Sequence, residues 1–147
     1  MINIICSGRI KEKYLSDLID DYKMRISKYH KINIIEIKDE NDLKKESTNI
    51  LKNVDSKDYV IACVINGREL ASPELAKLID EIFITNSTID FIIGSSDGLD
   101  ESILKRADLE LSFGKFTMPH GLFRGVLLEQ IYRAFKINNN EKYHKWG

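Results

Sequence analysis

Five short apolar runs recur along the chain, and a segment of helical character follows each of them. The runs cover residues 2–6, 32–37, 59–65, 89–94 and 109–113. Short runs rich in isoleucine and valine are typical of strands buried in a sheet. Because each pair of consecutive strands is separated by a helix, the order βαβαβαβαβα predicts an α/β fold. The expected architecture is a mainly parallel sheet with helices on both faces.

The segments between the runs support this alternation. Apolar side chains recur every three or four positions in residues 14–29, and residues 40–53 are strongly charged, as expected for an exposed helix. Ser72 is predicted as the N-cap of a further helix that has Pro73 in its first turn. The connections are too short for separate domains, so residues 1–147 are expected to form a single domain.

The last helical segment, residues 123–135, has apolar residues on nearly every side. Arg124, Glu129 and Arg133 are isolated exceptions. A surface helix normally keeps one polar face in water, so this helix must be covered on more than one side. Residues from His120 onward carry five Lys or Arg against two Glu, while the whole chain has a formal net charge of −1. The basic end is either a contact for a phosphate-rich partner or a solvated tail.

The rest of the composition narrows the class of protein. No apolar run approaches the roughly 18 residues that span a bilayer, so no membrane partner is expected. The first residues lack the basic start and apolar core of a signal peptide, which predicts a cytoplasmic protein. Cys6 and Cys63 lie in apolar runs and are interpreted as reduced core residues. Two cysteines make no metal site, and none is expected.

Ligands of open α/β sheets bind at the carboxyl ends of the strands, and three of these ends are unusual here. They are Asn66-Gly67, the segment Gly94–Gly98 and the loop Phe113–Pro119. The "GSSDG" segment resembles a phosphate-binding glycine loop but lacks the Lys-Ser/Thr of a P-loop. It is either a phosphate-binding turn or a plain tight turn from strand to helix. The loop is either an ordinary connection or a site whose backbone groups hydrogen-bond a planar heterocycle.

Four segments together resemble a known family. "FIIGSSDGL", "LSFGKFTMPH", "RGVLLEQIYRAFKI" and the terminal "YHK" are similar to the RlmH family, the small single-domain SPOUT methyltransferases. The opening "SGRIKEKYLSDLIDDYKMRISKY" is similar as well, so the resemblance covers essentially the whole chain. It implies a SPOUT fold with a C-terminal trefoil knot, an exception to the rule that chains avoid knots. It also implies a homodimer in which two subunits complete each active site.

The resemblance further implies the reaction and its cofactor. S-adenosylmethionine would bind in the knot, and the substrate would be ribosomal RNA in the assembled ribosome. The methyl group would go to N3 of a pseudouridine in the 23S rRNA stem-loop that meets the small subunit. Cofactor contacts would fall on the following residues: Cys63, Gly94, Phe113, Gly114, Lys115, Phe116, Thr117 and Met118.

The catalytic residues implied by the resemblance are Arg133, Tyr143, His144 and Lys145. His144 is either the base that removes the imide proton or a phosphate contact. The family usually has leucine in place of Cys63 and glycine in place of Ser95. The nearly all-round apolar final helix would then be covered by its own sheet and by a partner subunit.

Two other functions fit parts of the sequence. One is a SPOUT methyltransferase that acts on tRNA, but such chains usually carry an additional RNA-binding domain or a different terminal motif. The other is a nucleotide-binding α/β module without catalysis. That module would explain the glycine turn and the fold. It gives no reason for the loop Thr117–His120 or for the terminal Tyr-His-Lys.

Overall fold

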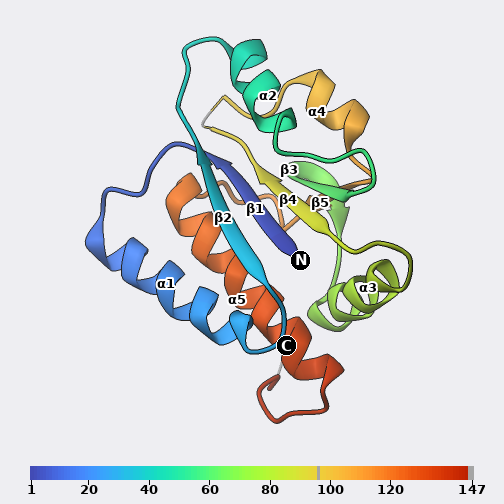
Figure 1. Ribbon diagram of the computed structural model, residues 1–147. Helices are drawn as coiled ribbons and strands as arrows, with labels where there is room; N and C mark the ends of the chain where they lie inside the picture. Colours follow the sequence, from blue (N-terminus) through green and yellow to red (C-terminus); the bar gives the residue numbers. More distant parts are fainter. Residues whose placement is uncertain (96, 146–147) are drawn as a thin grey trace.

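The computed structural model describes residues 1–95 and 97–145; Ser96, Trp146 and Gly147 lie outside the described residues. Five strands form one sheet in the order β2-β1-β4-β3-β5, and all four pairings are parallel. Their bounds are β1 Ile2–Ser7, β2 Ile32–Ile37, β3 Tyr59–Glu69, β4 Ile89–Ile93 and β5 Leu109–Ser112. Because every strand runs the same way, all five carboxyl ends lie along one edge of the sheet (Figure 1).

Five helices cover the two faces of this sheet. Three of them, α1 (Lys13–Ser27), α3 (Ser72–Thr85) and α5 (His120–Asn138), lie on one face. The shorter α2 (Leu43–Leu51) and α4 (Glu101–Arg106) lie on the other. The predicted parallel α/β fold with helices on both faces is therefore confirmed, while the trefoil knot stays a prediction.

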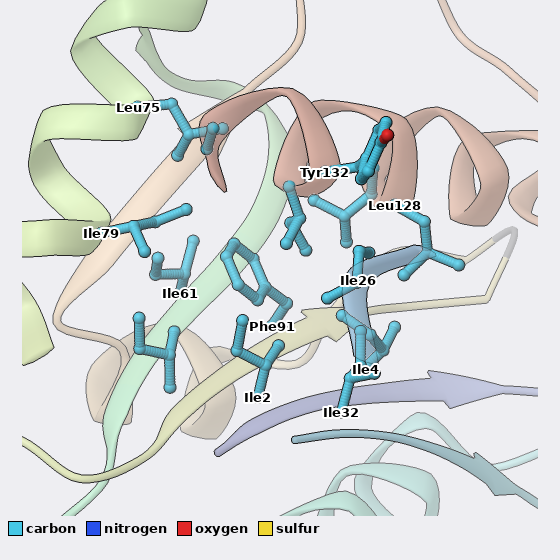
Figure 2. Packing of buried hydrophobic residues seen from close by; sticks show 14 of the residues in the cluster. Ile2, Ile4, Ile26, Ile32, Ile61, Leu75, Ile79, Phe91, Leu128 and Tyr132 are labelled. Carbon is cyan, nitrogen blue, oxygen red and sulfur yellow. The ribbon is translucent and has the colours of Figure 1, made fainter. Parts of the chain in front are cut away.

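The core follows from the alternation of side chains along each strand. On β1, Ile2 and Ile4 point towards α1, α3 and α5, whereas Ile5 points towards α2 and α4. Figure 2 shows the larger cluster, in which Phe91 of β4 lies beneath Leu128 of α5. Burying each such apolar side chain stabilises the fold by roughly 1.5–3 kcal/mol before conformational entropy is subtracted.

α5 lies between α1 and α3, which explains its nearly all-round apolar sequence within a single chain. Glycine lets α1 come close: a Cβ atom at Gly125 would lie 2.7 Å from the Leu18 side chain. On the other flank, the Ser72 hydroxyl donates to Gln130 Oε1 at 2.6 Å. The sheet, α1 and α3 thus supply the cover that the sequence demands. Leu122 of α5 remains exposed.

Two local predictions were wrong. The N-cap of α3 is Ala71, not Ser72, and the Ala71 N–H donates to Glu74 Oε1 at 2.8 Å. Ser72 is instead the first helical residue, which leaves its hydroxyl available for the bond to α5. An acidic side chain reaching back to the N-cap N–H satisfies one of the donors that a helix start leaves unpaired.

The second error concerns Asn66-Gly67, which does not end β3. The strand continues to Glu69, with a register irregularity between Cys63 and Arg68 where it pairs with β5. A Cβ atom at Gly67 would lie 2.7 Å from the backbone of Glu110, so glycine permits the close approach of the two strands. Pairing with β5 overrides the local turn signal.

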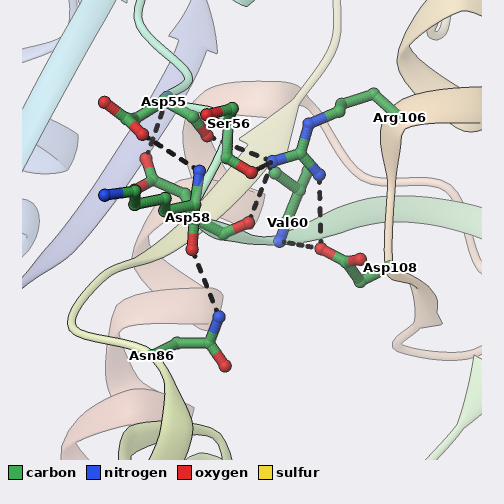
Figure 3. Close-up of polar contacts among 8 residues, drawn as sticks. Asp55, Ser56, Asp58, Val60, Asn86, Arg106 and Asp108 are labelled. Atoms are coloured by element: carbon green, nitrogen blue, oxygen red, sulfur yellow. Dashed lines mark hydrogen bonds and ion pairs between the residues drawn. The ribbon is translucent and has the colours of Figure 1, made fainter.

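Arg106 organises the amino edge of the sheet (Figure 3). Its guanidinium donates to the backbone carbonyls of Asp55 and Asp58, at 3.1 and 2.9 Å, and to the Asp108 carboxylate at 3.3 Å. The Asp108 carboxylate also accepts the Val60 N–H at 2.8 Å. These bonds fix the start of β3 against the end of α4 and satisfy backbone groups that the loop leaves unpaired.

A row of polar side chains crosses the sheet near this edge. Asn33 donates to Asn3 at 3.1 Å, and Asn3 donates to the buried Asp90 carboxyl at 2.9 Å. Burial, and next the hydrogen bond with Asp58, raise the pKa of Asp90 to about 7. The row joins β2, β1 and β4, and it places a proton-binding group inside the fold.

Candidate active site

A cavity of about 480 Å³ opens at the carboxyl ends of β3, β4 and β5. Its size falls within the range of small-molecule pockets, and the edge is the one at which α/β sheets bind ligands. Most of the residues predicted to contact a cofactor line it: Cys63, Gly94, Phe113, Gly114, Phe116, Thr117 and Met118. Lys115 is exposed and is absent from the lining, so its contact with a cofactor stays a prediction.

The loop after β5 forms one wall of this cavity. The Ser112 hydroxyl donates to the Ile65 carbonyl at 2.7 Å and accepts the Gly114 N–H at 3.1 Å. Gly114 has φ +113°, a conformation that favours glycine, and nothing lies within 4 Å of where its Cβ would be. The Phe113 ring packs edge-on against Phe123 at 5.0 Å. The loop therefore has a fixed start and leaves open space beside Gly114.

Gly94, Ser95 and Gly98 line the facing wall, where a backbone hydrogen bond closes a turn. The Gly98 N–H donates to the Ser95 carbonyl at 2.9 Å, and Gly98 has φ +84°. A Cβ atom at Gly94 would lie 2.5 Å from the Gly98 carbonyl oxygen. Ser95 is not among the described residues with positive φ, so a side chain fits its backbone conformation. Serine in place of the family's usual glycine is compatible with this turn.

Cys63 lines the cavity as a neutral, half-buried side chain. Burial raises the pKa of its thiol to about 12, and burial likewise raises the pKa of Cys6 to about 11. Both thiols are free, as the sequence predicted, although Cys63 is only half-buried. A thiol that stays protonated is a poor nucleophile, so Cys63 presents a neutral surface to the cavity.

The residues predicted as catalytic gather at the other end of α5, around Glu129. The Glu129 carboxylate accepts hydrogen bonds from Arg133 and from the Tyr143 hydroxyl, each at 3.0 Å. The Arg133 guanidinium also lies 4.7 Å above the Tyr143 ring and 3.1 Å from His144 Nδ1. Three of the four predicted residues are thus brought together, whereas Lys145 is exposed.

These contacts orient two side chains. A guanidinium can only donate, so His144 Nδ1 is the acceptor in the Arg133 contact and Nε2 is the ring nitrogen left to donate. Burial, followed by hydrogen bonds with Tyr22 and Glu129, raises the pKa of Tyr143. His144 Nε2 and the Tyr143 hydroxyl are therefore both hydrogen-bond donors in this arrangement.

Within one chain, the cavity and the Glu129 cluster are far apart. His120 lines the cavity at the start of α5, and Arg133 lies near the end of the same helix. At a rise of 1.5 Å per residue, about 20 Å of helix separates them. In one chain, His120 and Arg133 therefore lie towards opposite ends of α5.

The sequence analysis missed the roles of two residues on α5. Glu129 is the hub of the cluster, and its i,i+4 spacing from Arg133 was an available signal. Arg124 is completely buried: its guanidinium lies 2.9 Å from the Glu36 carboxylate and donates to the Ser7 and Gly8 carbonyls at 3.3 Å. Its partner Glu36 lies 88 positions earlier, and no local pattern reveals that pairing.

Two classes of site are absent from the part of the chain that the structure describes. Among residues 1–95 and 97–145, no helix has the length and apolar character needed to cross a membrane. The same residues contain no group of three or more His, Cys, Asp or Glu that could hold a metal ion.

Comparisons with known proteins identify the family of this chain. The family described as "Predicted SPOUT methyltransferase" matches residues 1–144. "Ribosomal RNA large subunit methyltransferase H" of Clostridium botulinum strain 657 is 50% identical, over 98% of this chain and 99% of the relative. The protein of the same name from strain Alaska E43 is 46% identical over the same shares.

A solved structure shares the fold at low identity. It is described as a probable methylase family protein from Haemophilus influenzae Rd KW20, and it superposes with a TM-score of 0.59 at 16% identity. The match covers 99% of this chain and 70% of that one. The family match and the full-length relatives, together with the strand-end cavity, show that this chain belongs to the SPOUT methyltransferase family, among the proteins related to ribosomal RNA large subunit methyltransferase H.

Proposed function

We propose that this methyltransferase uses S-adenosylmethionine to methylate N3 of a pseudouridine in the 23S rRNA stem-loop at the ribosomal subunit interface. The near full-length similarity to relatives named for methylation of large-subunit ribosomal RNA carries the proposal. The place of action is then the cytoplasm, where assembled ribosomes are found.

The cavity at the carboxyl ends of β3, β4 and β5 fits the cofactor. Phe113 and Met118 supply apolar walls, Gly114 leaves open space, and the loop offers backbone groups to a heterocycle. S-adenosylmethionine, when bound, supplies an activated methyl group on a sulfonium. The chain's contribution is to bind it, orient it and exclude water. Neutral Cys63 suits such an apolar wall.

A homodimer follows from the distance between the two groups of residues. Arg133 of the Glu129 cluster lies about 20 Å of helix away from His120 at the cavity on its own chain, which favours a second copy as the source of the tail at that cavity. Two apolar side chains that line the cavity are exposed: Phe116 is 90% exposed and Ile65 43%. Exposed apolar side chains of this kind are typical of interaction surfaces.

The tail then serves to position RNA. His144 presents Nε2 and exposed Lys145 supplies positive charge, both of which suit phosphate, while Arg133 is paired with Glu129 and contacts His144 Nδ1. This arrangement favours the phosphate-contact role for His144 over the role of base. Tyr143 already lies under the Arg133 guanidinium, so an unstacked base would stack on its other face.

The decisive experiment is methylation of purified ribosomes with and without pseudouridine at the target, read out by mass spectrometry. We expect one added methyl group, only on ribosomes that carry the pseudouridine. Methylation of tRNA and not of ribosomes would replace the proposal with the tRNA alternative. In calorimetry, S-adenosylhomocysteine should bind; preference for a phosphorylated nucleotide would instead support a non-catalytic module.

A further inference from the structure

A second cavity, of about 810 Å³, lies at the carboxyl ends of β1 and β2. Its walls come from the loop of residues 8–12, the end of β2 and the start of α5. Pro119 and His120 line both this cavity and the candidate cofactor cavity. The two cavities are therefore neighbours on either side of one junction between loop and helix. None of the residues predicted to bind cofactor or to act in catalysis lines the second cavity.

Buried Arg124 holds the loop that forms its wall. The guanidinium donates to the Ser7 and Gly8 carbonyls at 3.3 Å and pairs with Glu36 at 2.9 Å. The same Glu36 carboxylate accepts the Ile10 N–H at 3.2 Å. Four bonds thus tie three elements together, so the wall is preorganised. A fixed wall spares a bound group the cost of ordering the loop.

The charges at this cavity favour an anion with an aromatic part. Arg9, Lys11 and Lys38 are exposed, and none forms an ion pair within the described residues. The charge of Glu36 is already matched by Arg124, which leaves Glu12 and Asp39 against these three cations. Tyr14 is also at the rim; its side chain is 71% exposed and stacks on no other described ring.

We propose that this cavity binds a nucleotide of the RNA substrate, with phosphate on Lys11 and Lys38 and the base against Tyr14. The inference rests on the proposed function and extends it to a site on the opposite side of Pro119-His120 from the cofactor. Lysines without partners attract phosphate in a salt-dependent way, and an exposed aromatic ring stacks on any unstacked base. The volume lies within the range of pockets that enclose small molecules.

The test replaces both lysines with glutamate and measures methylation of purified ribosomes that lack the modification. The double variant Lys11→Glu/Lys38→Glu should raise KM at least ten-fold at 100 mM salt, because two phosphate contacts become repulsions. The dependence of KM on salt should weaken at the same time. The affinity for S-adenosylhomocysteine should stay within two-fold, since neither lysine lines the cofactor cavity.

The matched control is Lys52→Glu/Lys57→Glu, which makes the same change of charge on exposed residues at the opposite edge of the sheet. Its KM should stay within two-fold of the wild type. Tyr14→Ala should raise KM at least five-fold, and Tyr14→Phe should restore it because phenylalanine keeps the aromatic face. An unchanged KM in Lys11→Glu/Lys38→Glu, or equal effects in both double variants, overturns the inference.

A binding measurement separates failure of the inference from failure of the proposed function. Fluorescence anisotropy with a labelled RNA copy of the stem-loop needs no catalysis. If the wild type binds this RNA but methylates nothing, the proposed function fails, and a ten-fold loss in Lys11→Glu/Lys38→Glu still supports the cavity as an RNA site. If both proteins bind RNA equally well, the inference fails alone. If the wild type does not bind the isolated stem-loop, the comparison of KM on ribosomes decides the inference, and methylation of ribosomes decides the proposed function.

Discussion

The two ends of α5 are built in different ways. At its start, the cavity walls are held by bonds to backbone groups: the Gly98 N–H to the Ser95 carbonyl, the Ser112 hydroxyl to the Ile65 carbonyl, and the Arg124 guanidinium to the Ser7 carbonyl. At its end, the Glu129 cluster is held by side chains on one helix and a short returning tail. Substitutions at the start should therefore change cofactor binding and stability together. Substitutions at the end should change turnover and leave both nearly intact.

The largest expected effect comes from removing residues 143–147. Methylation of ribosomes should fall by at least about 100-fold, because alignment of the target contributes much of the rate. The affinity for S-adenosylhomocysteine should stay within a few-fold, since the tail lies at the far end of α5 from the cavity. Calorimetry and a ribosome assay on the same preparation check this. A truncated protein with the normal rate would show that the tail is merely solvated.

The next largest effect is expected from Gly94→Val, in the turn after β4 that lines the cavity at the start of α5. Its Cβ would meet the Gly98 carbonyl at 2.5 Å, so the turn must open, and both the melting temperature and cofactor affinity should fall. Gly114→Val meets no neighbour but strains a backbone at φ +113°, at a cost of about 1–3 kcal/mol. We expect affinity losses of at least ten-fold in both, with the greater loss of stability in Gly94→Val. An unchanged affinity for S-adenosylhomocysteine in both variants would show that the cofactor does not bind in this cavity.

His144→Ala should have a smaller effect, confined to turnover. The single-turnover rate at saturating ribosome should fall about ten-fold, the loss expected for one charge-neutral hydrogen bond to a charged group. Raising the pH should not restore the rate, because the structure gives His144 the role of a donor. A rate that recovers with pH would show that His144 is the base. Gln at the same position, which keeps an N–H donor, serves as the matched control.

The smallest effect on activity is expected from a substitution of Asp90. Because Asp90 lies outside both groups of predicted site residues, its titration should change stability and not the methylation rate. Its pKa is about 7 in the fold against 3.8 in a model peptide, so the folded state favours the protonated form. The contribution of Asp90 to the free energy of unfolding is therefore fully present below about pH 4. It falls as the pH rises towards 7, by at most about 1.4 kcal/mol per pH unit. Asp90→Asn removes this titration. The melting temperature of Asp90→Asn minus that of the wild type should increase from pH 5 to pH 8, because only the wild type loses this contribution. Methylation should be unchanged. A constant difference in melting temperature would contradict the raised pKa.

Local pattern was enough to predict the order of elements and the strand ends at which the cavity lies, whereas the residues predicted to contact a cofactor came from the resemblance to a known family. Each of the five strands has a run of apolar residues, and the residues at strand ends meet because the sheet is parallel. What escaped prediction depends on partners distant in the chain. Asn66-Gly67 looks like a turn until β5 pairs with it, and Ser72 looks like an N-cap until Gln130 takes its hydroxyl. Arg124 looks like a surface residue because Glu36 is 88 positions away.

The place of α5 between α1 and α3 also has a consequence for synthesis. Until the ribosome has released α5, the face of the sheet that carries Ile4 and Phe91 lacks its central cover. Domains acquire their stable packing only when the last core element is available. Because α5 also carries His120 and the Glu129 cluster, stability and both functional regions arise in one late step. We expect chains that stop short of α5 to expose apolar surface and to be removed by cellular proteases, so that few partly active molecules accumulate.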